Sequence, residues 1–182
     1  MKRVSLFLGV ALMALFMASC GSGKQVASTY PCPDCKSTTD VFRYLGQHVA
    51  SSDRQMQQAR SQAANAARVQ LASMVEVTVK SVVDNYTSEY VTGAESDFRQ
   101  RLQNISRTVV NQLLVGTPVT CEGTMPSTSI QGATICFACV ELTGKSVLDG
   151  IASQVSNDEK LRTDFEYEKF KKVLEEEMNK LQ

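Results

Sequence analysis

Residues 130–142 read IQGATICFACVEL and predict the central strand of a β-sheet. Side chains alternate between the two faces of a strand, and here both faces are apolar. Such a strand is typical of a position that is central in the sheet or covered on both sides. One face would carry Ile135, Phe137 and Cys139, and the other would carry Cys136, Ala138, Val140 and Leu142.

Two further segments predict strands that pair with it. Residues 119–125 precede it and connect to it through a turn at Pro126-Ser127-Thr128, which predicts a hairpin. Residues 40–49 form a shorter run of β-branched, aromatic and aliphatic residues interrupted by Gly46, and they predict a first strand.

A long helix is predicted between the first strand and the hairpin. Ser52-Asp53-Arg54-Gln55 fits a capping box, in which the hydroxyl accepts from free N–H groups and the amide reaches back. Apolar residues then recur at intervals of three and four from Met56 to Tyr86, and Gly93 ends the element. The stripe begins with alanines and becomes bulkier, so its N-terminal end permits the close approach of another element.

Three more helices are predicted. Residues 98–113 are amphipathic, and Gly116 stands where a left-handed C-terminal cap would lie. Residues 145–155 predict a short helix and residues 166–181 a charged one, whereas 158–165 fit either a strand or a helix.

Together these elements predict an α+β fold, in which a small antiparallel three-stranded sheet is packed by the long helix and by further helices. The order is β-α-α-β-β-α-α. We assign residues 40–182 to this single domain, with the charged helix at its C-terminus. Residues 20–39, which are rich in Gly, Ser, Thr and Pro, are assigned to a tether and N-terminal loop.

The composition excludes several functional classes. The chain has 19 basic and 19 acidic residues, which argues against nucleic acid as a partner because such proteins carry a basic excess. A single histidine excludes metal sites built from several histidines. The hydrophobic fraction of 43% is too high for a disordered chain.

The N-terminus has the pattern of an export signal. Lys2 and Arg3 precede an apolar run over residues 6–18, which is too short to span a bilayer core of about 30 Å. Met17-Ala18-Ser19-Cys20 resembles the lipobox of bacterial lipoproteins. The resemblance implies that residues 1–19 are a lipoprotein signal peptide and that Cys20 is lipidated and becomes the first residue. The alternative is an ordinary signal peptide with an incidental cysteine.

The residues around Cys20 also bear on location. The resemblance implies several acyl chains on Cys20, and several chains anchor a protein stably in a lipid bilayer. We therefore expect a membrane as a partner. By similarity to known sorting rules, Gly21 in place of Asp favours the outer membrane over the inner one. We therefore expect a cell-envelope protein that faces the periplasm, with surface exposure left open.

Short patterns in the domain resemble the LPP20-like envelope lipoproteins, in the version found in gut Bacteroidetes. They are FRYLG at residues 42–46, the alanine-rich start of the long helix, VKSVV at 79–83 and the hairpin ending at residues 140–142. The resemblance covers about residues 40–155. It implies a small α+β envelope domain and supplies no catalytic residues.

Besides Cys20, five cysteines remain, which is an odd number for an exported protein. Cys32-Pro33-Asp34-Cys35 has the spacing of a redox motif but lies in a predicted loop. A structural disulfide, local or long-range, is the main interpretation for Cys32 and Cys35. Unpaired thiols and a catalytic or metal-binding pair are the alternatives.

A second C-x2-C pair, Cys136 and Cys139, raises the question of a four-cysteine zinc site. Residues three apart on a regular strand point to opposite faces, so these two cannot bind one ion. We therefore expect no metal site and interpret both as small buried hydrophobic residues. A bridge from Cys121 to one of them across the hairpin remains open.

No catalytic set or cofactor motif is recognisable, and His48 has no nucleophile paired with it in the sequence. The leading hypothesis is a non-enzymatic lipoprotein that acts through envelope protein partners or self-association, without a cofactor. A thiol-disulfide redox protein that uses Cys32 and Cys35 is the second hypothesis. A small-ligand-binding module is the third, because a sheet under a long helix can shelter an apolar pocket.

Overall fold

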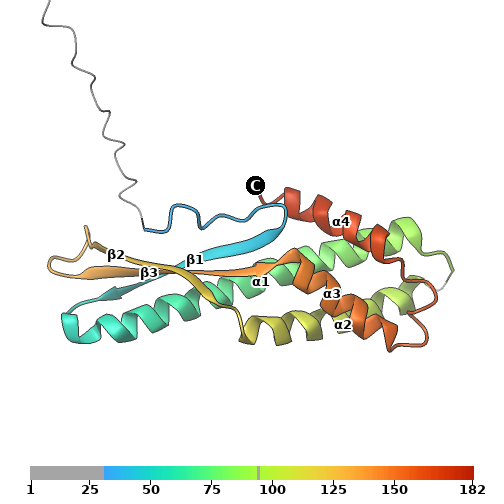
Figure 1. Cartoon of the computed structure of the whole chain (residues 1–182), viewed down its shortest axis with the longest axis horizontal. Helices are drawn as coiled ribbons and strands as arrows, with labels where there is room; N and C mark the ends of the chain where they lie inside the picture. Colours follow the sequence, from blue (N-terminus) through green and yellow to red (C-terminus); the bar gives the residue numbers. More distant parts are fainter. Residues whose placement is uncertain (1–30, 94) are drawn as a thin grey trace, which may run out of the picture.

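The computed structural model describes residues 31–93 and 95–182, and their arrangement confirms the α+β fold (Figure 1). Three antiparallel strands form one sheet, and helices pack along it and beyond its end. In chain order the elements are β1 (Val41–Ala50), the short 3-10 helix η1 (Asp53–Gln55), α1 (Met56–Tyr90), α2 (Glu95–Val115), β2 (Val119–Pro126), β3 (Thr134–Thr143), α3 (Gly144–Ser156) and α4 (Tyr167–Asn179).

Strand β3 is the centre of the sheet, whose order is β1-β3-β2. The prediction from its two apolar faces is confirmed, because every residue from Cys136 to Val140 is buried. The predicted start at residue 130 is wrong. Ala133 N–H donates to the Ile130 carbonyl at 3.2 Å and Gly132 has φ +77°, so these residues turn the chain and pairing begins at Thr134.

The alanine-rich half of α1 covers one face of the sheet. Its alanines pack with Ala50 of β1 and with Cys136 and Ala138 of β3 in a small apolar cluster. Small side chains bring the helix backbone close to the strand: a Cβ atom added to Gly46 of β1 would lie 2.5 Å from the Ala67 nitrogen. The predicted close approach at this end of the helix is therefore confirmed.

The bulkier half of α1 forms the main core with α2, α3 and α4. Tyr86 is fully buried there, and its hydroxyl donates to the Asp164 carbonyl at 3.2 Å and accepts from the Glu166 N–H at 2.8 Å. Burial raises the pKa of this phenol above its ordinary value. These bonds fix the segment 158–165, which forms successive turns rather than a strand or a long helix.

Two local predictions about helix ends are wrong. The Ser52 side chain makes no cap, and Gln55 reaches instead to the Ser51 N–H at 3.1 Å, because a turn of 3-10 helix precedes α1. Gly116 does not adopt a positive φ. The end of α2 tightens through a bond from the Gly116 N–H to the Leu113 carbonyl at 3.3 Å, so no left-handed residue is needed.

Helix α4 has the charged outer face that its sequence predicts. Lys171 pairs with Glu175 and Lys172 pairs with Glu176, both at 3.8 Å and well exposed to solvent. Exposed pairs of this kind contribute little to stability. The helix is held instead by its buried side, which carries Phe170, Val173, Leu174, Glu177 and Met178.

Candidate functional site: a disulfide-bonded strap across the sheet

The face of the sheet opposite α1 is crossed by residues 31–39, which we call the strap. Figure 1 shows this segment, in blue, running beside the sheet before it enters β1. The strap contains no helix or strand, but it is bonded to all three strands in turn. Residues 31–39 are therefore a fastened part of the domain, whereas the sequence assigned them to a tether and loop.

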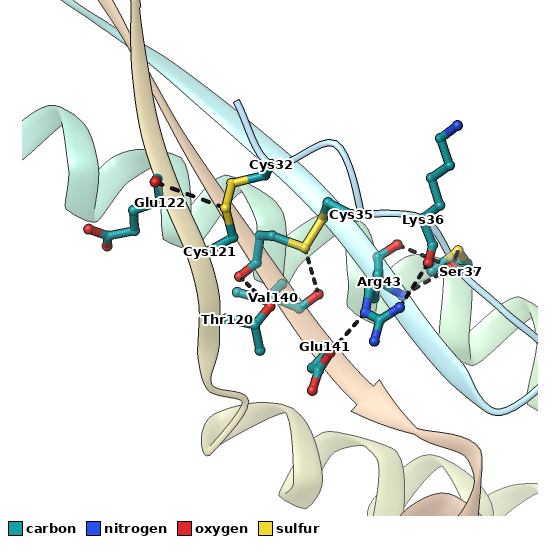
Figure 2. Close-up of a disulfide and its surroundings, with 12 residues drawn as sticks. Cys32, Cys35, Lys36, Ser37, Arg43, Thr120, Cys121, Glu122, Val140 and Glu141 are labelled. Atoms are coloured by element: carbon teal, nitrogen blue, oxygen red, sulfur yellow. Dashed lines mark hydrogen bonds and ion pairs between the residues drawn. A yellow bond between two sulfur atoms is a disulfide. The ribbon is translucent and has the colours of Figure 1, made fainter. Parts of the chain in front are cut away.

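Two disulfides join the strap to the hairpin (Figure 2). Cys32 is bonded to Cys121 of β2, and Cys35 is bonded to Cys139 of β3. The corresponding Cα atoms are 5.8 and 5.9 Å apart, in the usual range for a disulfide. Of the pairings that the sequence left open, the structure has the long-range kind for both Cys32 and Cys35 and not a local bond between them.

A β-bulge aligns the two hairpin cysteines. Val119 pairs with Val140, but the next pair is Cys121 with Cys139, so two steps along β2 match one step along β3. The extra residue, Thr120, shifts Cys121 into the position opposite Cys139, and both sulfur atoms then point to the strap. Bulges commonly redirect a side chain in this way.

Hydrogen bonds hold the other end of the strap to β1. The Ser37 hydroxyl accepts from the Arg43 N–H at 3.0 Å and donates to the Arg43 carbonyl at 3.2 Å. The Arg43 guanidinium donates to the Lys36 carbonyl at 3.4 Å and forms an ion pair with Glu141 of β3 at 2.8 Å. The strap thus completes a second layer over a sheet face that no helix of the described chain covers.

Cys136 is the free cysteine among those described, and it is fully buried on the α1 side of β3. Its sulfur lies 4.0 Å from the Met56 carbonyl oxygen at the start of α1. Cys139 faces the strap, so the two cysteines lie on opposite faces of the strand, and the second C-x2-C pair does not converge on a common point. Within residues 31–93 and 95–182, no three metal-binding side chains of His, Cys, Asp or Glu come together.

His48, the other candidate from the sequence, is exposed near the end of β1. Its surroundings are Ser51 and glutamines of α1, which line a shallow pocket with it. None of these groups is hydrogen-bonded to the imidazole in the described structure. This arrangement is typical of a surface histidine.

Comparison with known proteins does not assign a function to the strap. No family model, curated protein or solved structure matches this chain. Among the described residues, no helix combines the length and the apolar character needed to cross a bilayer. Cys20 lies outside the described residues. The geometry of the strap and the sequence before it are therefore the observations from which a function can be inferred.

The sequence did not identify Ser37, Arg43 and Glu141 as the polar end of this site. The interpretation of Cys136 and Cys139 as small buried hydrophobic residues is confirmed for Cys136 and wrong for Cys139, which is bonded to Cys35. The one signal in the sequence was that alternation along the strand places Cys139 on the face opposite Cys136. The local pattern C-x2-C draws attention to neighbours in the chain, whereas the bonds connect cysteines 89 and 104 residues apart.

Proposed function

We propose that this chain is a lipid-anchored protein of a bacterial cell envelope, attached through Cys20 to the outer membrane and facing the periplasm. Its role there is to bind or support other envelope components, not to catalyse a reaction. The LPP20-like resemblance of the domain agrees with this placement. One observation carries the proposal: the segment that follows the candidate anchor is bonded covalently to the sheet.

The two disulfides support an exported location. Disulfides persist in oxidising compartments such as the periplasm and are rare in the cytosol. Both bonds fasten the strap, which is the first part of the described chain after Cys20. A pull on the anchor would therefore load the sheet through covalent bonds.

The chain length sets how far the domain can stand from the membrane. Cys32, the first bridged position, comes 12 residues after Cys20. At most about 3.6 Å per residue, that segment spans no more than roughly 40 Å. The domain would accordingly work close to the membrane surface, within reach of partners held there.

Metabolic labelling with a radioactive fatty acid tests the anchor. We expect label on the wild-type protein and on Cys136→Ala, and none on Cys20→Ala, because the thiol of Cys20 is the proposed acceptor. The Cys136→Ala variant removes a cysteine without touching the anchor or the disulfides. Equal labelling of Cys20→Ala and the wild type would reject the proposal.

A further inference from the structure

The four bridged cysteines belong to one cluster. Cys32, Cys35, Cys121 and Cys139 line the same small cavity of about 260 Å³ between the strap and the sheet. Figure 2 shows the two disulfides close together between the strap and the hairpin. Four cysteines can be paired in three ways, so the observed pairing is one of several that the cluster could hold.

The hairpin cysteines are positioned to bond to each other. Cys121 and Cys139 are direct partners in the register of β2 and β3, and both side chains face the strap. Directly opposed residues of antiparallel strands have Cα atoms about 4.5–5.5 Å apart. A disulfide accepts Cα separations of about 4.4–6.8 Å, so a bond across the strands needs no change of register.

The strap cysteines are also close enough to bond. The Cys35 N–H donates to the Cys32 carbonyl at 3.0 Å, which closes a turn over the four residues 32–35. The ends of such a turn lie within about 7 Å of each other. Cys32 also has φ +57° and is the one non-glycine residue with positive φ in the described chain. The backbone of Cys32 therefore has a conformation that residues other than glycine rarely adopt.

We propose that the cluster is a thiol–disulfide exchange site that converts the bonds 32–121 and 35–139 into 32–35 and 121–139. Its co-reactant is a small thiol, or an exchange protein that presents a thiolate. The present state fastens the strap to the hairpin, and the exchanged state releases it. The proposal stands on the pairing and register of the cysteines and does not depend on the lipid anchor.

The exchange balances without an oxidant. An external thiolate attacks the sulfur of Cys121, bonds to it and releases Cys32 as a thiolate. Cys32 then attacks Cys35, which forms the 32–35 bond and releases Cys139. Finally, Cys139 attacks Cys121 in the mixed disulfide, which forms the 121–139 bond and returns the external thiolate. Two disulfides are present before and after, and no electrons are gained or lost.

Solvent accessibility favours the bond between Cys32 and Cys121 as the point of attack. Cys121 is partly exposed on the edge strand β2, whereas Cys139 in the central strand is 1% exposed. Thiol–disulfide exchange depends on access as well as on thiolate character. Once both bonds are exchanged, the hydrogen bonds of Ser37 and Lys36 to Arg43 still attach the end of the strap to β1.

Release of the strap would also let the domain stand farther from the membrane, and this consequence alone rests on the proposed function. The path from Cys20 to the first attached residue would grow from 12 residues, ending at Cys32, to 16, ending at Lys36. The face of β3 that the strap covers would become more exposed at the same time.

The test maps disulfides in the full chain before and after incubation with a substoichiometric amount of reduced glutathione. Free thiols are blocked, and trypsin and cyanogen bromide then cut at Lys24, Lys36, Arg107, Met125 and Lys145. The strap cysteines lie in peptide 25–36, Cys121 lies in 108–125 and Cys139 lies in 126–145. The native pairing gives one species that joins all three peptides.

Exchange gives a different set of masses. Peptide 25–36 is then free and two hydrogens lighter than its reduced form, and peptides 108–125 and 126–145 are joined only to each other. We expect this form in at least about a tenth of the molecules, which corresponds to a free-energy difference of at most about 1.4 kcal/mol between the two pairings. The double variant Cys35→Ser, Cys139→Ser is the control, because it keeps the bond between Cys32 and Cys121 but its peptide 25–36 cannot form an internal disulfide. Any release of peptide 25–36 from this variant therefore measures plain reduction.

The proposal is overturned if glutathione leaves the three peptides joined, or if peptide 25–36 is released only together with blocked thiols on Cys121 and Cys139. The second result is plain reduction and not exchange. Fatty-acid labelling at Cys20 is measured separately, so a failure of the anchor and a failure of the exchange give different results.

Discussion

Replacement of all four bridged cysteines with serine will lower the free energy of unfolding by about 7–8 kcal/mol in the chain-entropy model. The bond from Cys35 to Cys139 spans 104 residues, and a loop of about 100 residues contributes about 4.7 kcal/mol. With that bond in place, the second one closes a much shorter loop, which adds about 3 kcal/mol. Since domains are typically stable by about 5–15 kcal/mol, the variant should be largely unfolded near physiological temperature.

Urea unfolding followed by circular dichroism measures this loss. The double variant Cys32→Ser, Cys121→Ser keeps the bond between Cys35 and Cys139, and its free energy of unfolding should fall by about 3 kcal/mol. Cys136→Ala is the matched control, because it removes a buried cysteine that has no disulfide, and it should lose about 1 kcal/mol. If the fourfold variant were as stable as this control, the disulfides of the strap would not contribute to the stability of the domain.

The regular elements of this protein follow from side-chain periodicity. The alternation in β3 predicts its central place, and the intervals of three and four predict α1 and α2, because burial on one side of each element repeats with its geometry. Where turn geometry decides, prediction fails. The start of β3 moves to Thr134 because Gly132 turns the chain, and the caps at Ser52 and Gly116 differ because short 3-10 turns compete with them.

The strap could not be derived in the same way. Its nine residues have no periodicity, and its bonds depend on which distant strand lies beneath each cysteine. The bulge at Thr120, which aligns Cys121 with Cys139, leaves no pattern in the sequence. The odd cysteine count and the two-faced alternation of β3 were the available signals. They indicated that at least one cysteine is unpaired within the chain and that Cys136 and Cys139 face opposite ways, but they did not show which cysteines are bonded.

Gly46→Val will produce the second large effect, a loss of about 3 kcal/mol or more in the free energy of unfolding. The Cβ atom of any side chain at this position would lie 2.5 Å from the Ala67 nitrogen and 2.9 Å from its Cα. These atoms belong to the backbone of α1, so no rotation of a side chain can relieve the overlap. The helix must move away from the sheet, and the alanine cluster between them would lose its packing.

A comparison of three glycine variants by urea unfolding separates this cause from the general effect of removing a glycine. Gly116→Ala meets no atom within 4 Å and does not require a positive φ, so it should be neutral or slightly stabilising, by up to about 1 kcal/mol. Gly46→Ala, which adds only the clashing Cβ, should already cost about 1–3 kcal/mol. Equal stability of Gly46→Ala and Gly116→Ala would mean that α1 and β1 are not in backbone contact. The close approach of helix and strand would then not be the reason that small residues fill this interface.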